Sequence, residues 1–390
     1  MTSSLPRLHL YGARADVDLA ALRYNVATLR AQLIGTARLF AVVKANAYGH
    51  GAIPCATAAL SAGADALAVG RVAEGLALRE AGIDAPILVL GYNTAAETEP
   101  AVQAGLALTP SSIDAVADVA AAAARLQRPA ALHVKVDTGM QRLGLPLAEA
   151  ARVIAVARAH PDVRLKGIYT HFACADDPDP SLSERQFQRF CDFAACVDPG
   201  HALTWHACNT AAARRFPRMH LDAVRIGIGL YGFDPCDCGV VPAIHRDLRP
   251  ALTLRSTILR TFDLAPGESL GYGATFTATS PTRIATVACG YADGLPRLLS
   301  NRGAALVQGG RCPIVGRVSM DFCTIDITGV ADIGSAEPQT GDDVVFIGCQ
   351  GDVAITAAEV ADLAGTISYE VLCGISARVP RSYDGSNTTA

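Results

Sequence analysis

Short apolar segments alternate with helical segments eight times before residue 232. Each apolar segment has the length of a strand, and apolar residues recur at helical spacing in the stretch that follows it. Eight β/α units in this length predict a parallel (β/α)8 barrel of the TIM type. The expected strands are 39–43, 66–70, 86–91, 106–109, 131–136, 165–171, 202–206 and 224–230.

The pattern changes after Gly232. Residues 235–250 hold two cysteines and three prolines without periodicity, so we expect a linker there. β-Branched residues and turns then predict a mostly-β domain with one helix at 357–364. We therefore expect a barrel domain over residues 1–234 and a β domain over 235–390. The short strand expected at 14–19 could belong to either domain. Residues 381–390 are expected to form a polar tail. The strands expected in the β domain are 252–261, 283–288, 304–307, 312–318, 323–327 and 344–347.

The composition excludes several classes of protein. The 390-residue chain is 51% hydrophobic and 18% charged, which favours large cores over disorder. Its net charge of -4 offers no basic surface to nucleic acid. Residues 1–20 lack the apolar region of a signal peptide, and no apolar run is long enough to span a membrane, so we expect a cytoplasmic protein. Its twelve cysteines would then stay reduced, and the pair Cys236 and Cys238 lacks zinc-site spacing, so no metal is expected.

Lys44 ends the first expected barrel strand. The run 39–43 is wholly apolar, and a lysine at the end of such a buried strand is costly unless it is neutralised or bonded. A desolvated amine has a lowered pKa and becomes a nucleophile that can form a Schiff base. For a lone lysine the alternative is a side chain that extends back to solvent.

Reactive residue types follow four other expected strands as well. Because catalytic groups of such barrels lie at the carboxyl ends of the strands, these residues together form a site hypothesis. They are Lys135, His171, Asn209 with Thr210, and Arg225.

The segment Gly227–Gly232 has the spacing G-x-G-x-x-G. A dinucleotide site is not favoured, because the motif follows the last strand and opens a linker instead of a βαβ unit. Small residues here would let backbone N–H groups approach a phosphate, which barrels often bind after strands seven and eight. Asn209 and Thr210, at the start of a helix, would add further donors, although Asn209 also suits a plain helix cap.

Taken together, these segments resemble the alanine racemase family of barrel-type pyridoxal-phosphate enzymes. The resemblance spans nearly the whole chain in the family's order. It rests on the segments 41–51, 135–144, 170–176, 206–211, 225–232, 271–276, 290–297, 316–321 and 366–381.

The resemblance implies a function and an assembly. Lys44 would bind pyridoxal 5'-phosphate covalently and act as the base on one face of the substrate, and Tyr272 would be the base on the other face. Tyr272 would reach the active site of a partner subunit, which makes the enzyme a homodimer. The reaction would interconvert L-alanine and D-alanine and supply D-alanine for peptidoglycan.

It also implies roles for the other site residues. His171 would pack beside the cofactor ring and Arg225 would face its pyridine nitrogen, which an arginine leaves largely unprotonated because it keeps its own proton. Arg142 and the Met320 backbone would bind the substrate carboxylate. Lys135 matches a lysine that is often carbamylated in the family. The phosphate would be held by Tyr48, Thr210, Gly227, Ile228 and Tyr369, and the passage through which substrate enters would include Asp176, Arg297, Arg317 and Ile367.

Three alternatives stay open. A broad-specificity amino-acid racemase is one, since Ser319 beside Met320 departs from the family pattern in the carboxylate pocket. A barrel-type decarboxylase would need an acidic residue near the ring nitrogen, where Arg225 stands. A cofactor-carrying regulatory barrel would not need a β domain with Tyr272 and Met320.

Overall fold

A computed structural model describes residues 12–235, 247–330 and 336–384, and the chain divides into two compact units. The barrel unit is Leu19–Pro250. The β unit joins the residues up to Asp18 with those from Ala251 onward. The barrel unit continues to Pro250 because the Asn25 side chain accepts a hydrogen bond from Arg249 N (2.8 Å) and donates one to Arg249 O (2.8 Å).

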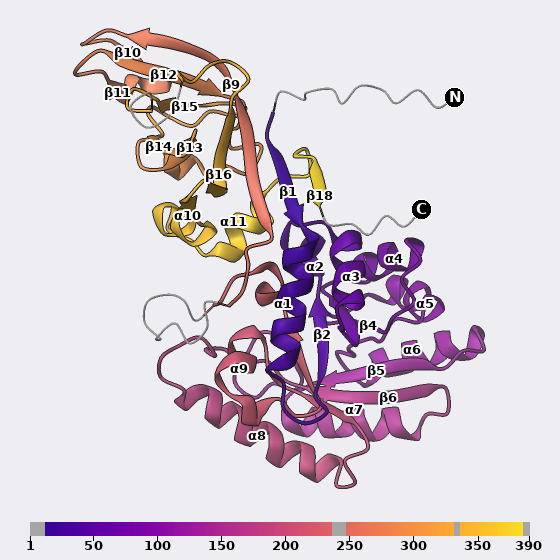
Figure 1. Cartoon of the computed structure of the whole chain (residues 1–390). Coiled ribbons are helices and arrows are strands. Elements are labelled where there is room, and N and C mark those ends of the chain that lie inside the picture. The colour runs from indigo at the N-terminus through magenta and orange to yellow at the C-terminus, as the bar shows by residue number, and fades with distance from the viewer. Residues whose placement is uncertain (1–11, 236–246, 331–335, 385–390) are drawn as a thin grey trace. The chain divides into compact units, whose positions relative to one another are not determined.

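Seven parallel strands form the sheet of the barrel unit, in the order β4-β3-β2-β8-β7-β6-β5. Every neighbouring pair in it is parallel, and helices lie around the strands (Figure 1). The strands are β2 (Arg38–Val42), β3 (Ala66–Val69), β4 (Ile87–Val89), β5 (Ala130–Lys135), β6 (Val163–Tyr169), β7 (Thr204–His206) and β8 (Ala223–Ile226). The helices are α1 (Leu19–Ala31), α2 (Lys44–Tyr48), α3 (Ala52–Ser61), α4 (Val72–Glu80), α5 (Ala95–Gln103), α6 (Ile113–Arg125), α7 (Leu147–Ala159), α8 (Ser181–Val197) and α9 (Thr210–Arg215).

The fourth expected strand, 106–109, is reduced to two bridges. Ala107 pairs with Leu88 of β4, and Leu108 pairs with Leu132 of β5. Pro110 follows directly and has no N–H to continue a ladder. The two bridges still join β4 to β5, so the expected TIM-type architecture is confirmed with seven full strands.

The last barrel strand is shorter than the sequence predicts. We expected a strand over 224–230, but β8 ends at Ile226. Gly227 has φ −109° and ψ −96°, outside the strand region, and residues Ile228–Tyr231 form a 3₁₀ turn, η2. The chain therefore bends immediately after Arg225 and Ile226.

The β unit is built on β9 (Leu252–Leu264), a strand of 13 residues. β9 pairs antiparallel with β1 (Arg14–Asp18), β12 (Thr282–Val287) and β16 (Asp343–Gln350). A separate two-stranded ribbon joins β10 (Ser269–Leu270) to β11 (Phe276–Thr277). The remaining elements are β13 (Ala304–Val307), β14 (Gly310–Pro313), β15 (Cys323–Asp326), β17 (Val353–Ile355), α10 (Ala357–Ala364) and α11 (Ser368–Gly374). The expected mostly-β character of this unit is confirmed.

The end of the chain differs from the expected tail. Residues Arg381–Asp384 form β18, which pairs in parallel with β1. Ser382 also donates a hydrogen bond to Asp16 (2.5 Å), a contact between the two ends of the chain. Residues 236–246 of the linker expected at 235–250, including Cys236 and Cys238, lie outside the described residues, as do the final residues 385–390.

Three further observations concern the described part of the chain. Its ten cysteines are all free thiols. It contains no cluster of three or more side chains suited to hold a metal ion. None of its helices combines the length and the apolar character needed to cross a membrane.

Candidate active site

Lys44 precedes a backbone turn in left-handed conformation. After β2 the residues Ala45 to Tyr48 all have φ between 52° and 54°, which is left-handed helical conformation. This conformation costs roughly 1–2 kcal/mol per non-glycine residue and is normally adopted by single residues. Four in succession require strong support from their surroundings.

Glu74 of α4 supplies part of that support. Its carboxylate accepts hydrogen bonds from the backbone N–H of Ala45 (2.6 Å), Gly70 (2.7 Å) and Arg71 (3.0 Å). The turn is also closed by Asn46, whose side chain accepts from Ala52 N (2.8 Å). The carboxylate therefore ties the residue after Lys44 to the end of β3. Sequence analysis missed Glu74, for which the only signal is its place in the first turn of α4.

A small cradle lies where β8 ends. Thr210 Oγ1 accepts a hydrogen bond from Gly227 N (3.0 Å), which leaves the hydroxyl proton free to donate. A Cβ placed on Gly227 would overlap the Tyr48 hydroxyl, so any larger residue here would force Tyr48 to shift. Asn209 caps α9 by accepting from Ala212 N (3.0 Å). The structure thus brings together Tyr48, Thr210 and Gly227, with Ile228 next in the chain.

Arg225 is buried and surrounded by hydrogen-bond acceptors. Its guanidinium donates to the backbone oxygens of Thr170 (2.7 Å), Ala207 (2.9 Å) and His206 (3.1 Å). It also reaches Nδ1 of His171, at 3.3 Å. Burial lowers the pKa of Arg225 to about 10, so it stays protonated at neutral pH. A fixed positive charge therefore lies between the ends of β6, β7 and β8.

A chain of hydrogen bonds runs from Arg225 through two histidines that the sequence analysis missed, His206 and His133. Arg225 Nη1 lies 2.8 Å from His206 Nδ1, and His206 Nε2 lies 3.0 Å from His133 Nδ1. Because arginine can only donate, His206 accepts at Nδ1 and donates from Nε2 to His133. Burial lowers the pKa of His206 well below its usual range and that of His133 to about 3, so both rings are neutral. Nothing in the sequence distinguishes these residues from other polar residues of buried strands.

Lys135, at the end of β5, is buried and has a perturbed pKa. Burial, reinforced by the charges of Arg225, Arg142 and Lys44, lowers its pKa to about 8. Its amine and the guanidinium of Arg225 lie 5.8 Å and 5.2 Å from the centre of the Tyr169 ring. A substantial fraction of Lys135 is therefore neutral at slightly alkaline pH.

Two loops carry Arg142 and His171. Asp137 Oδ1 accepts from the backbone N–H of Gly139 (2.8 Å) and Met140 (3.0 Å), which shapes the turn that leads to the exposed Arg142. His171 follows β6, and Gln186 of α8 donates to its backbone oxygen (3.1 Å). Burial lowers the pKa of His171 well below its usual range, and the charge of Arg225 adds to this effect.

Asp176 lies exposed in the loop after His171. Arg215 of α9 holds this loop by donating to the backbone oxygens of Ala175 (2.7 Å) and Asp177.

The other predicted site residues belong to the β unit. Tyr272 is 73% exposed on a 3₁₀ turn, η3 (Tyr272–Ala274), between β10 and β11. It lines a pocket of about 550 Å³ with Tyr291, Arg297, Arg317 and Met320. Ile367, 61% exposed, precedes α11, and the half-buried Tyr369 lies on that helix.

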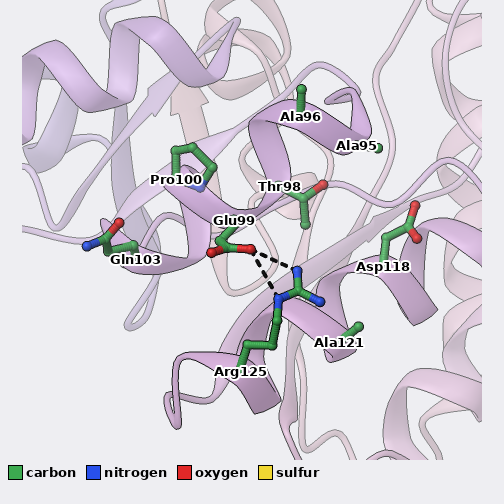
Figure 2. A pocket seen from close by; sticks show the side chains of 9 residues that line it. All are labelled: Ala95, Ala96, Thr98, Glu99, Pro100, Gln103, Asp118, Ala121 and Arg125. Atoms are coloured by element: carbon green, nitrogen blue, oxygen red, sulfur yellow. Dashed lines mark hydrogen bonds and ion pairs between the residues drawn. The ribbon is translucent and has the colours of Figure 1, made fainter.

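A second pocket of about 490 Å³ lies between α5 and α6 of the barrel unit (Figure 2). Its charged groups include Glu99 and Arg125, which already form an ion pair at 2.8 Å. It contains none of the predicted site residues.

Known proteins match the chain over nearly all its length. The family models for the alanine racemase N-terminal domain and C-terminal domain match residues 17–235 and 251–383. Alanine racemase 2 of Oceanobacillus iheyensis is 43% identical over 370 residues, covering 94% of this chain and 92% of the relative. Alanine racemase of Symbiobacterium thermophilum is 43% identical over 376 residues, covering 95% and 97%.

Solved structures agree with these relatives. Alanine racemase from Streptomyces lavendulae superposes with a TM-score of 0.89 at 36% identity, covering 96% of this chain and 98% of that one. Alanine racemase from Bacillus anthracis with bound L-Ala-P gives 0.88 at 37% identity, covering 96% and 95%. Since the two family models together match most of the chain and the relatives align almost end to end, the chain belongs to the alanine racemase family of isomerases.

Proposed function

We propose that this enzyme interconverts L-alanine and D-alanine with pyridoxal 5'-phosphate, using Lys44 and Tyr272 as two bases. The observation that carries the proposal is the arrangement at the end of the barrel strands. Lys44 lies there at the start of the left-handed turn. Gly227 forms a cradle with Tyr48 and Thr210. Arg225 supplies a buried positive charge. The bound L-Ala-P of the Bacillus anthracis relative supports alanine as the substrate.

The residues of the barrel unit fit this cofactor. A phosphate suits the cradle because Gly227 has no side chain to obstruct it and the Thr210 hydroxyl has a proton to donate. The phosphate would be held by Tyr48, Asn209, Thr210, Gly227 and Ile228, with Tyr369 from the β unit. His171 would pack beside the ring and Arg225 would face the ring nitrogen. When bound, the cofactor supplies the electron sink that makes the α-proton acidic.

Racemisation requires proton transfer on two opposite faces of the α-carbon. Lys44 Nζ would take or return the proton on one face and Tyr272 Oη on the other, each acting as acid when the other acts as base. Arg142 and the Met320 backbone would bind the carboxylate of alanine and so orient its α-carbon between the two bases. Asp176, Arg297, Arg317 and Ile367 would line the passage by which alanine enters.

We further propose a homodimer in which Tyr272 serves the site of a second copy. Several large apolar or aromatic side chains around the Tyr272 pocket are exposed, which is typical of an interaction surface. They are Tyr272, Tyr291, Met320 and Phe322. We also propose that the enzyme acts in the cytoplasm and supplies D-alanine for peptidoglycan. The free thiols of the described cysteines are consistent with that reducing compartment.

Chiral chromatography tests the reaction directly. Purified protein with pyridoxal phosphate should convert L-alanine to equal amounts of both enantiomers and leave L-serine, L-lysine and L-arginine nearly unchanged. Racemised lysine or arginine would instead support a broad-specificity racemase, and conversion to an amine would support a decarboxylase.

Lys44 is expected to be the residue that binds the cofactor covalently. The chain has only two other lysines, Lys135 and Lys166, and Lys166 is exposed on β6, so Lys166→Ala is a matched control. After borohydride reduction, peptide mass spectrometry should find the cofactor on Lys44 in the wild type and in Lys166→Ala. Lys44→Ala should carry no label and lose racemisation. A labelled Lys44→Ala protein would refute the assignment.

Tyr272→Phe removes the proposed base on one face only. Exchange of the α-proton with D2O, followed by NMR, should persist for one enantiomer and fall roughly 100-fold or more for the other. Tyr24→Phe, on α1, should leave both rates unchanged. Equal losses for both enantiomers in Tyr272→Phe would argue against two separate bases.

Carbamylation of Lys135 should follow its lowered pKa. Carbon dioxide reacts with the neutral amine, which becomes the major form of Lys135 as the pH rises through about 8 instead of 10.5. With ¹³C-labelled carbon dioxide at constant pressure, NMR should detect a carbamate that forms over this lower pH range and disappears in Lys135→Arg. A carbamate signal that survives in Lys135→Arg, or none in the wild type, would contradict the expectation.

A further inference from the structure

Asn301 joins two separate segments of the β unit. It follows the 3₁₀ turn η4 (Arg297–Leu299) and has φ +56°. Its side-chain oxygen accepts a hydrogen bond from Gly316 N (2.6 Å), and its side-chain nitrogen donates to Thr275 Oγ1 (3.1 Å) and to Thr275 O (3.4 Å). One amide group thus uses its acceptor on one segment and its donors on the other.

Both segments carry residues of the proposed site. Thr275 ends the turn η3, which begins at Tyr272. Gly316 precedes Arg317, and a Cβ placed on Gly273 would lie 3.2 Å from the Arg317 guanidinium carbon. The neighbouring Ser300 accepts a hydrogen bond from Val318 N (3.0 Å), two residues before Met320. Asn301 and Ser300 therefore hold the segment that leads to Met320, and Asn301 links that segment by hydrogen bonds to Thr275 at the end of the Tyr272 turn.

The residues of the Tyr272 turn are exposed, whereas the ribbon on either side is anchored by Leu270 and Phe276, which pack in a cluster with Val315. None of the residues of η3 is buried, so side-chain packing does not fix them. The ribbon that flanks the turn pairs Ser269 with Thr277 and Leu270 with Phe276, and Ala278 continues it by backbone hydrogen bonds to Gly267 and Glu268. Such a short two-stranded ribbon is marginally stable by itself. The Asn301 hydrogen bonds to Thr275 therefore add a link at the exposed turn itself, where side-chain burial supplies none.

We propose that Asn301 is a positioning residue for Tyr272: its side-chain amide fixes the Tyr272 turn against the Gly316–Met320 segment. This inference rests on the proposed role of Tyr272 as a base. Asparagine suits the position for two reasons. It tolerates a positive φ, and its amide can accept and donate at the same time, which neither aspartate nor an apolar residue can do.

Two variants separate the side chain from the backbone. Asn301→Asp keeps the acceptor for Gly316 N and loses the donors to Thr275. Asn301→Gly keeps the positive φ without strain and loses every side-chain bond. In both variants, α-proton exchange should slow roughly 10- to 100-fold for the enantiomer that depends on Tyr272, because small displacements of a catalytic group have effects of this size. Exchange of the other enantiomer and the cofactor content should stay near wild type.

Gln308→Gly is the matched control. Gln308 also has a positive φ, +49°, and its side chain donates to Asp342 (3.1 Å) in the same unit. This variant should leave both exchange rates unchanged. Thr275→Val removes one acceptor of the Asn301 amide, so it should slow the same enantiomer and add little in the Asn301→Asp background.

The outcomes distinguish this inference from the proposed function. If Tyr272→Phe gives one-sided exchange but the Asn301 and Thr275 variants exchange like the wild type, or slow both enantiomers equally, the role of Asn301 is refuted and the two-base proposal stands. If Tyr272→Phe itself is not one-sided, the proposed function fails and the inference fails with it. Should Asn301→Gly not fold, Asn301→Asp and Thr275→Val decide the matter.

Discussion

The burial of one guanidinium organises the end of the barrel. Arg225 donates hydrogen bonds to backbone oxygens at the ends of β6 and β7 and, because it can only donate, fixes the tautomer of His206 and through it that of His133. Its charge also contributes to the lowered pKa of Lys135. A removable proton at this position would change every one of these states. An arginine keeps its own charge constant across the physiological pH range, so these states do not vary through its protonation.

The candidate site stores backbone strain beside a cradle of small residues. The left-handed turn after Lys44 is held by Glu74, and Gly227 lets the Tyr48 hydroxyl approach the backbone. Strain of this kind persists only where surrounding contacts determine the conformation. The same principle applies in the β unit, where an exposed turn carries Tyr272 and the Asn301 amide supplies contacts that packing does not.

The sequence predicted the architecture better than the supporting residues. The short apolar segments of the sequence located all seven full barrel strands, because buried parallel strands are continuous apolar runs. It overstated 106–109, which Pro110 limits to two bridges, and it missed β18, whose polar residues become a strand only by pairing with β1. Reactive residues at strand ends could be recognised from position and family pattern. Glu74, His206 and Asn301 could not, because their partners are distant in sequence and their roles depend on which backbone groups the fold brings to them.

The pairing of β1 with β9 and β18 has a consequence for synthesis of the chain. β1 is synthesised before both of its partners, since β9 begins only at Leu252 and β18 at Arg381. The whole of Leu19–Pro250 emerges before β9 and can form its local β/α contacts while β1 is still unpaired. The sheet of the β unit can be completed only after β18 has been synthesised, whereas the barrel is free to fold earlier in translation.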